Sequence, residues 1–328
     1  MFLESNVNKD KSFCTGALTL MYNSRFFEEK TEELFKQGLI HGTTHLANGQ
    51  EASQAGLCMA LTDKDWIVPT HRCHGFTICR GSSAYSMFSE MFGSSHGLAK
   101  GLGGSMHMPD REHGNLGSSA VVGSGIPLAT GIAFDMKYNG KEGVSVAIFG
   151  DGASGRGSLH ESMNLASIWK LPVLFYCENN LYGMSAPSSA MISVPRIADR
   201  AAAYNMSGLT VDGNDFDTVY EACLKALSHI REGKGPFLLE VMTYRTKGHS
   251  KSDRRLYRTA EEEAYWASRD PIMLYENKLA NEGILTRDDI SKIRESCLEN
   301  IEKQASRALE DSIDRLTEQE ALDLVYAP

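Results

Sequence analysis

One segment constrains the fold of this chain more than any other. An apolar run at 144–149 ends in Gly150-Asp151-Gly152, and a second apolar run at 173–176 leads to Glu178-Asn179-Asn180. Between the two runs, apolar residues recur at helical spacing: Leu159, Met163, Ala166 and Trp169. The pattern therefore predicts a strand, a glycine-rich turn, a helix and a second strand, which is the repeating unit of a parallel α/β sheet.

Two polar side chains follow directly after these predicted strands. Asp151 and Asn180 are expected at the C-terminal ends of two neighbouring parallel strands, where open α/β sheets bind ligands. A carboxylate and an amide oxygen suit Mg²⁺, which takes hard oxygen ligands and shares them with substrate phosphates. The glycines beside Asp151 would let a diphosphate approach the backbone at the start of the following helix. The segment therefore predicts a metal–diphosphate site.

The same letters also satisfy a second motif. Gly150, Gly152 and Gly155 form G-x-G-x-x-G after a strand, with Glu178 placed 23 positions later, as in nicotinamide-dinucleotide sites. A bare carboxylate at Asp151 argues against this interpretation, because it would repel a pyrophosphate that no metal ion bridges. We favour the metal–diphosphate site and keep an NAD-dependent oxidoreductase as a distant alternative.

Plainer roles also exist for the two polar residues. Asp151 could cap the helix expected to begin near Ser154, since Asp is common before helices. Asn179 and Asn180 could be ordinary turn residues.

Several further blocks resemble one enzyme family, in the same order along the chain. They cover residues 25–52, 71–76, 97–108, 197–206, 211–215 and 243–253. Together with GDG and NN about thirty residues apart, which is the thiamin-diphosphate motif, they are similar to the alpha subunit of the 2-oxo-acid and acetoin dehydrogenases. These are the decarboxylating first components of larger complexes. The resemblance covers about residues 15–275 and implies a parallel sheet with helices on both faces, the diphosphate-binding domain of the thiamin-diphosphate-binding fold, with a helical C-terminal extension.

The resemblance also implies roles for individual residues. It implies Mg²⁺ ligation by Asp151, Asn180 and the backbone carbonyl of Tyr182, and catalytic roles for His45 and His249. It implies contacts to thiamin diphosphate from His71, Arg72, Val122, Asp151, Gly152, Ala153, Asn180, Tyr182 and His249. His74 and His107 lie in matching blocks and are expected to support the site from behind.

Chain length bears on domains and partners. We expect a single diphosphate-type domain over 1–328, with a helical region at about 1–65 and a helical segment at about 260–328. There is no room for the second domain, whose glutamate activates the cofactor's pyrimidine. The resemblance therefore implies a beta subunit in an α₂β₂ heterotetramer, and a lipoyl-bearing acyltransferase as acceptor.

Substrate preference is suggested by the same blocks. Thr-His-Arg-x-His-Gly at 70–75 and Leu-Tyr-Arg-Thr at 256–259 are more similar to the acetoin branch than to the pyruvate and branched-chain 2-oxo-acid members, which remain the alternative. Ser118-Ser119-Ala120 departs from the glycines usual in this family. We expect the Ala120 methyl group to reshape the substrate pocket.

Composition excludes some other classes. A net charge of −9 without a run of basic residues argues against nucleic acid or an anionic membrane as the main partner. No apolar run reaches the length of about 18 residues that a membrane helix needs. The first residues lack a signal or transit pattern, which indicates the cytoplasm of a bacterium and argues against control by phosphorylation of Ser250 or Ser252. Seven scattered cysteines indicate reduced thiols.

Overall fold

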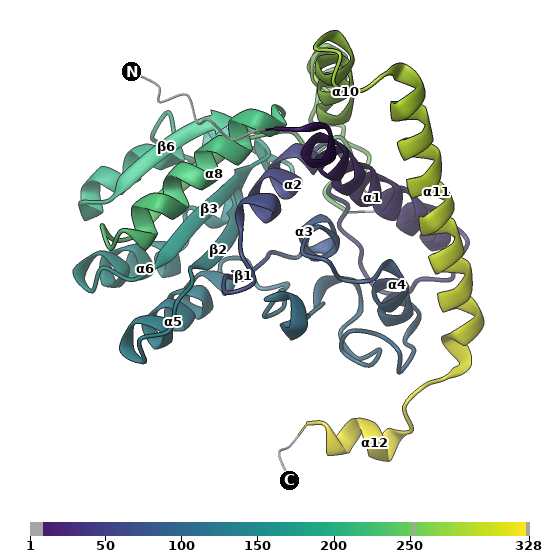
Figure 1. The fold of residues 1–328 in the computed structure, drawn as a ribbon. Coiled ribbons are helices and arrows are strands. Elements are labelled where there is room, and N and C mark those ends of the chain that lie inside the picture. Colours follow the sequence, from purple (N-terminus) through teal and green to yellow (C-terminus); the bar gives the residue numbers. More distant parts are fainter. Residues whose placement is uncertain (1–8, 251–252, 326–328) are drawn as a thin grey trace.

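A five-stranded parallel sheet forms the centre of the molecule (Figure 1). The structure is a computed structural model that describes residues 9–250 and 253–325. The strand order is β1-β2-β3-β7-β6, with β1 at Trp66–Val68, β2 at Ser145–Gly150, β3 at Val173–Asn179, β6 at Ser207–Asp212 and β7 at Phe237–Met242. Every neighbouring pair in this sheet is parallel. A separate antiparallel pair, β4 (Tyr182–Gly183) and β5 (Ala186–Pro187), follows β3. The parallel α/β fold predicted from the sequence is confirmed.

Side chains alternate between two cores along each central strand. In β2, Val146 and Ile148 pack into one core, whereas Ala147 and Phe149 pack into the other. This alternation follows from the period of two in a strand, and it means that both faces of the sheet are buried.

Helices cover both faces (Figure 1). One face is covered by α5 (Gly125–Tyr138), α6 (Gly157–Ile168) and the 3₁₀ helix η4 (Ile197–Tyr204). The other core is built by α1 (Lys11–Lys36), α2 (Glu51–Ala60), α3 (His74–Cys79), α4 (Ala84–Phe92), α8 (Phe216–Arg231), α10 (Pro271–Asn281) and α11 (Arg287–Glu310). The remaining helices are α7 (Ser188–Met191), α9 (Ala260–Ala267), α12 (Glu318–Asp323) and the 3₁₀ turns η1 (Gly104–Met106), η2 (Arg111–His113), η3 (Asp151–Ala153) and η5 (Asp311–Ile313). The helical C-terminal segment, expected from about residue 260, is present.

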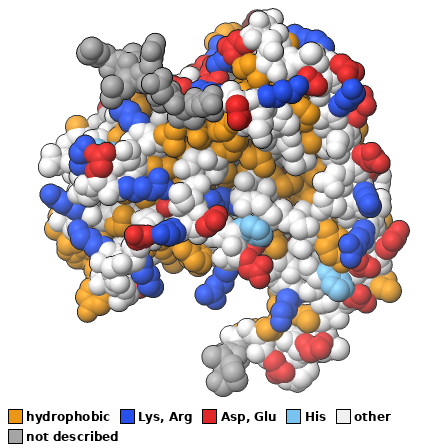
Figure 2. Space-filling model, viewed as in Figure 1, with side chains coloured by type: hydrophobic (Ala, Val, Ile, Leu, Met, Phe, Trp, Pro, Cys, Tyr) orange, Lys and Arg blue, Asp and Glu red, His pale blue; other side chains and the backbone are white. Residues whose placement is uncertain are grey.

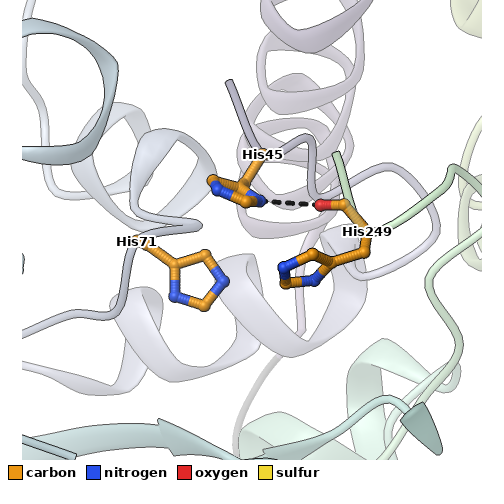
Figure 3. A group of neighbouring side chains, drawn as sticks. All are labelled: His45, His71 and His249. Carbon is orange, nitrogen blue, oxygen red and sulfur yellow. Dashed lines mark hydrogen bonds between the residues drawn. The ribbon is translucent and has the colours of Figure 1, made fainter. Parts of the chain in front are cut away.

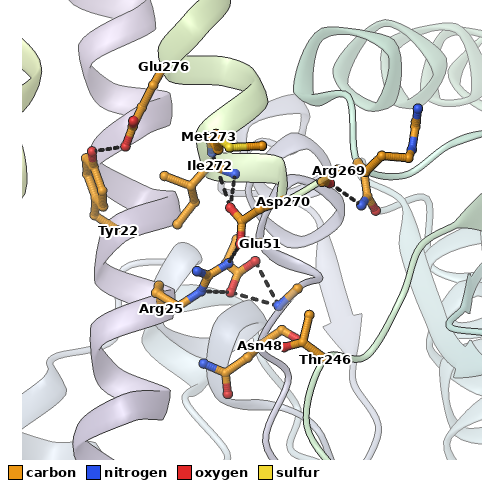
Figure 4. A network of polar contacts seen from close by, with 12 residues as sticks. Tyr22, Arg25, Asn48, Glu51, Thr246, Arg269, Asp270, Ile272, Met273 and Glu276 are labelled. Atoms are coloured by element: carbon orange, nitrogen blue, oxygen red, sulfur yellow. Dashed lines mark hydrogen bonds and ion pairs between the residues drawn. The ribbon is translucent and has the colours of Figure 1, made fainter. Parts of the chain in front are cut away.

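An ion-pair network ties three of these helices together (Figure 4). Arg25 of α1 donates to Glu51 of α2 at 2.5 Å and to Asp270, which caps α10, at 2.8 Å. Glu51 also accepts the backbone N–H of Gly49. The network therefore fixes the segment that leads from His45 into α2.

Glu90 of α4 holds a glycine-rich loop in place. Its buried carboxylate accepts four backbone N–H groups, from Ala99, Gly101, Gly103 and Gly104, at 2.7–3.0 Å. The loop at 97–104 therefore takes its position from a helix side chain.

Some expectations need correction. Residues 69–125 are rich in Gly and Ser, which is typical of functional loops, but α3 and α4 lie within them, because Met87, Phe88 and neighbouring apolar residues are buried. Trp169 follows the end of α6 and is 45% exposed, so it does not extend the buried stripe of that helix. The strands β1 and β6 were not predicted.

Surface and thiols fit the composition. On the described part of the face in Figure 2, acidic and basic side chains are interspersed. Among the described residues, no helix combines the length and apolar character that a membrane crossing requires. All seven cysteines are buried and free, as the spacing predicted.

Candidate active site

A cavity of about 280 Å³ lies where successive parallel strands end at the same edge of the sheet. The segments after four strands supply its polar side chains: His71 and Arg72 after β1, Asp151 after β2, Asn180 after β3, and Arg245 and His249 after β7. The parallel register therefore gathers residues that lie up to 178 positions apart in the sequence, from His71 to His249.

Asp151 is buried with one oxygen unpaired. Asp151 is 2% exposed, and its Oδ2 has no hydrogen-bond partner among the described residues. Burial raises the pKa of the carboxyl group to about 6. A buried unpaired acid is costly, so its presence at a cavity indicates a site for a cation.

Two further oxygen-bearing residues line the same cavity. Asn180 donates from Nδ2 to Gln50 Oε1 at 2.9 Å, which fixes the orientation of its amide and leaves the oxygen as acceptor. Tyr182, just after Asn180 and Leu181, begins β4. Carboxylate, amide and carbonyl oxygens are the donor set that Mg²⁺ takes, so these residues fit the metal implied by the sequence.

Two buried guanidinium groups converge on one histidine. Arg72 Nη2 lies 3.2 Å and Arg245 Nη1 lies 3.3 Å from Nδ1 of His249. Arg72 also donates to the carbonyls of Leu46, at 2.7 Å, and His249, at 2.9 Å. Burial, followed by the charge of Arg245, lowers the pKa of Arg72 to about 9. Two guanidiniums in one buried place suit an anion, and arginine suits a phosphate in particular.

Three histidines, His45, His71 and His249, face one another (Figure 3). The ring of His45 lies 4.6 Å from that of His71 and 4.8 Å from that of His249. Burial, with Arg72 contributing, lowers the pKa of His45 and His249 to about 4 and that of His71 to about 2. All three imidazoles are therefore neutral at pH 7.

Hydrogen bonds fix the tautomers of two of these rings. Nδ1 of His45 lies 2.7 Å from the carbonyl oxygen of His249 and must donate to it, which leaves Nε2 as an acceptor. Nδ1 of His249 accepts from two guanidiniums, which places its proton on Nε2. Nε2 of His71 is buried without a partner among the described residues.

The histidine cluster could also be considered as a metal site, since its ligand atoms lie within 4.8 Å of one another. Two observations argue against it. The lone pair on Nδ1 of His249 is already taken by Arg72 and Arg245, and the charge of these two groups repels a cation. The cluster is therefore better suited to anionic oxygens.

The structure brings most of the residues predicted for the site together. Those assigned to the cofactor all line the cavity: His71, Arg72, Val122, Asp151, Gly152, Ala153, Asn180, Tyr182 and His249. His45 does not line the cavity, but its ring Nδ1 contacts the backbone carbonyl oxygen of His249. His107 is exposed, and its Nδ1 lies 3.1 Å from Gly103 O. His74 is fully buried against Glu28 and Ser105.

The departure at 118–120 is placed differently from our expectation. Ala120 is exposed and does not line the cavity. Ser119 does line the cavity, and Ser118 donates to Met106 O at 2.7 Å. The structure therefore places Ser119, and not Ala120, at the cavity, and an effect of Ala120 on the substrate pocket stays a prediction.

Helix capping and turn formation were the simpler roles considered for Asp151, Asn179 and Asn180, and only Asn179 has such a role. The helix after Asp151 begins at Gly157 with Arg156 as its N-cap, so Asp151 is not a helix cap. Asn179 Oδ1 accepts the N–H of Leu181, so Asn179 acts as a turn residue, whereas Asn180 faces the cavity.

Two residues that line the cavity were not among the site residues predicted from the sequence. Arg245 is 1% exposed and follows β7 just as Asn180 follows β3, and this position after a predicted strand could have revealed it. Glu178 was considered only as a ribose ligand. It lies inside β3, accepts from Ser53 at 2.9 Å, and has its pKa raised to about 8 by burial. A carboxyl group engaged in this way is poorly placed for a ribose, which argues against the dinucleotide interpretation.

An acidic, oxygen-rich corner beside paired arginines, at the carboxyl edge of a parallel sheet, is the arrangement of α/β proteins that hold a cofactor by its diphosphate. Comparison with known proteins narrows this class. Residues 19–316 match the family described as "Dehydrogenase E1 component". The chain therefore belongs to the dehydrogenase E1 component family, whose members are thiamin-diphosphate-dependent oxidoreductases of the acetoin and pyruvate dehydrogenase type.

Similar proteins support this assignment. The chain is 45% identical over 287 residues to the alpha subunit of acetoin:2,6-dichlorophenolindophenol oxidoreductase from Bacillus subtilis, covering 87% of this chain and 86% of the relative. It is 39% identical over 288 residues to the pyruvate dehydrogenase E1 alpha subunit of Rhizobium meliloti, covering 88% and 83%. It is 40% identical over 298 residues to the human somatic mitochondrial form of that subunit, covering 89% and 74%.

Proposed function

We propose that this chain is the alpha subunit of a Mg²⁺- and thiamin-diphosphate-dependent dehydrogenase that cleaves acetoin, or a related 2-oxo compound, and passes the acyl unit to a lipoyl acyltransferase. The observation that carries the proposal is the unpaired, buried Oδ2 of Asp151 in one cavity with the Arg72–Arg245 pair. A cation at Asp151 and an anion at the arginines would satisfy both groups together.

The described residues divide the work of holding the cofactor. Asp151, Asn180 and the carbonyl of Tyr182 would ligate Mg²⁺. Arg72, Arg245 and the Nε2–H of His249 would donate to the diphosphate, with Gly152 and Ala153 lining it. The bound cofactor supplies the electron sink for chemistry at the substrate carbonyl.

His45 is the proton-handling residue in this proposal. Its pKa of about 4 keeps the ring neutral, and its Nδ1–H is held by the His249 carbonyl, so Nε2 offers a lone pair at neutral pH. A fixed neutral imidazole can accept a proton from a substrate hydroxyl group and return it later. His249 holds this ring in place as well as facing the diphosphate.

Exposed apolar side chains at the rim of the cavity support the proposal that a second subunit binds there. Apolar side chains at the cavity are exposed to solvent in this chain: Val121 (67%), Val122 (40%), Met184 (63%) and Met191 (46%). Grouped exposed apolar residues at a site indicate that another chain covers them. We infer a beta subunit in an α₂β₂ heterotetramer, which brings the glutamate that activates the pyrimidine.

Two further expectations from the sequence stay predictions: a single domain over residues 1–328 and a location in the bacterial cytoplasm.

Acetoin is favoured over the alternatives by two observations. The relative from Bacillus subtilis is named for acetoin, and His71 lies in the block at 70–75 that resembles the acetoin branch. His71 presents an unpaired Nε2 at the cavity. Pyruvate or a branched-chain 2-oxo acid remains the second candidate because of the pyruvate dehydrogenase relatives.

The test is co-expression with the cognate beta subunit, followed by dichlorophenolindophenol reduction with Mg²⁺ and thiamin diphosphate. Acetoin, pyruvate and branched-chain 2-oxo acids are compared at equal concentrations. We expect acetoin to dominate, and Asp151→Ala to abolish turnover and cofactor binding. Dominant turnover of a 2-oxo acid would replace the substrate and keep the mechanism. Turnover by the alpha chain alone would refute the shared site, and tight NADH binding without a thiamin requirement would refute the cofactor.

A further inference from the structure

One guanidinium group beside the cavity is enclosed by three tyrosine rings. The Arg258 side chain is 0% exposed, and its Cζ lies 4.6 Å from the ring centre of Tyr244, 5.1 Å from that of Tyr182 and 5.6 Å from that of Tyr257. Its Nε, Nη1 and Nη2 have no hydrogen-bond partner among the described residues. The ion pair with Glu263 is long, at 4.0 Å. The aromatic faces are therefore the main contacts of this buried charge.

The first of these rings belongs to the metal side of the site. Tyr182 carries the backbone carbonyl proposed to ligate Mg²⁺, and its hydroxyl donates to Glu262 of α9 at 2.8 Å. The hydroxyl of Tyr244 donates to the other oxygen of Glu262 at 2.9 Å. Glu262 and Arg258 therefore hold the two rings from two directions.

The other side of the cage leads to the diphosphate. Tyr257 accepts from Arg245 Nη2 at 2.9 Å and donates to Asp253 at 2.6 Å. Asp253 also accepts the backbone N–H of His249 at 2.6 Å. Arg258 thus lies between the segment that carries the proposed metal ligand and the segment that carries the proposed phosphate ligands.

We propose that Arg258 is a positioning residue that fixes the Tyr182 carbonyl relative to Arg245 and His249, an inference that rests on the proposed function of these residues. A buried guanidinium without hydrogen bonds does little for folding, since an apolar side chain of similar size would avoid its desolvation cost. Its effect should therefore appear in the alignment of the two halves of the site and hence in metal-dependent cofactor binding.

The experiment compares Arg258→Met, Arg258→Lys and Arg307→Met in the complex with the beta subunit. Arg307 is the matched control, because its Cζ lies 4.7 Å from the ring centre of Tyr85 on a different helix, where its side chain is 70% exposed. The dissociation constant of thiamin diphosphate is measured by calorimetry at several Mg²⁺ concentrations, and thermal unfolding is measured without cofactor.

For Arg258→Met we expect cofactor affinity to fall about tenfold or more, because the Tyr182 carbonyl would no longer be held in a fixed position relative to Arg245 and His249. Raised Mg²⁺ should partly restore it, and the cofactor-free unfolding temperature should stay equal or rise. Arg258→Lys should be intermediate and Arg307→Met unchanged. Arg258→Lys alone carries the test if Arg258→Met does not fold.

Other outcomes separate the two proposals. Wild-type affinity in the Arg258 variants, a loss that Mg²⁺ does not relieve, or an equal loss in Arg307→Met would overturn the role of Arg258. A wild-type complex that binds no thiamin diphosphate would instead overturn the proposed function.

Discussion

Two groups of buried polar side chains differ in their hydrogen bonding: in one group the polar atoms have partners, and in the other several do not. In the first, His74 lies between Glu28 and Ser105, with Nδ1 2.8 Å from Glu28 Oε2 and Nε2 3.0 Å from Ser105 Oγ. In the second, at the cavity, Asp151 Oδ2, His71 Nε2 and Arg245 Nε have no partner among the described residues. Both groups include residues of the sequence blocks that carry the family resemblance, but only the second group lines the cavity.

The difference separates a structural network from a ligand site. The order Glu, His, Ser resembles a hydrolase triad, but all three side chains are buried, and Glu28 Oε1 is also satisfied by the N–H of Ala47. A network that completes its own hydrogen bonds stabilises the fold. The cavity group leaves its hydrogen bonds to a ligand and is costly to the fold until that ligand arrives.

The largest effect is expected from breaking the paired group. Glu28→Ala leaves His74 and the N–H of Ala47 without an acceptor, so the free energy of unfolding should fall by about 3–5 kcal/mol. Denaturant unfolding of the cofactor-free protein measures it. Glu33→Ala on the same helix is the control, since Glu33 is half exposed and makes surface contacts with Lys30 and Gln37, so the free energy of unfolding should change by less than about 0.5 kcal/mol. Equal effects of both changes would contradict the distinction.

At the cavity we expect the opposite result, in which a substitution raises the free energy of unfolding. Burial raises the pKa of Asp151 from 3.8 to about 6, so the contribution of this group to stability is present below pH 3.8 and lost as the pH rises through 6. Asp151→Asn removes that loss and should stabilise the cofactor-free protein by about 2–3 kcal/mol at pH 8, with no gain near pH 3.5. Unfolding at the two pH values measures this. A destabilised variant at pH 8 would show that Asp151 is paired in solution.

A smaller effect concerns protons released by metal binding. Because Mg²⁺ needs the ionised carboxylate, binding of Mg²⁺ alone should weaken by up to about tenfold for each pH unit below 6. Calorimetry in buffers of different ionisation enthalpy should record about half a proton released at pH 6 and almost none at pH 8. His45 and His249 do not interfere, since their pKa values are about 4. Release that does not depend on pH would assign the metal elsewhere.

The smallest effect tests the far end of the paired group. Ser105→Ala removes one hydrogen bond to His74 but keeps the carbonyl of residue 105, which lies 3.1 Å from Nε2. The free energy of unfolding should fall by about 1 kcal/mol or less, with unchanged cofactor affinity. A loss of affinity as large as that expected for Asp151→Ala would make this serine part of the ligand site.

Local patterns predicted the centre of the fold. The two apolar runs became β2 and β3, and the polar residues after them, Asp151 and Asn180, line the same cavity because adjacent parallel strands end together. Residues Phe237–Met242, another apolar run in the sequence, form β7. Long apolar segments carry their own periodicity, so neither prediction needed knowledge of distant contacts.

Tertiary contacts account for what was missed. The strand β1 has three residues, and β6 lies at the sheet edge with half-exposed side chains, so neither shows a clear pattern. Arg258 is an ordinary charged residue by sequence, and only the fold places Tyr182, Tyr244 and Tyr257 around it. The exposure of Ala120 likewise depends on the path of the whole loop.

The four N–H groups gathered by Glu90 have an evolutionary consequence. The Glu90 carboxylate binds backbone N–H groups of residues 99–104 and not their side chains, so substitutions that keep the backbone path cost little. Three glycines resist replacement: Gly101 and Gly104 have positive φ, and a Cβ at Gly103 would lie 2.1 Å from the carbonyl oxygen of His107. An insertion or deletion would pull several amides from the carboxylate at once. Among related sequences this loop should therefore vary in chemistry while keeping its length, and Glu90 should change only together with that length.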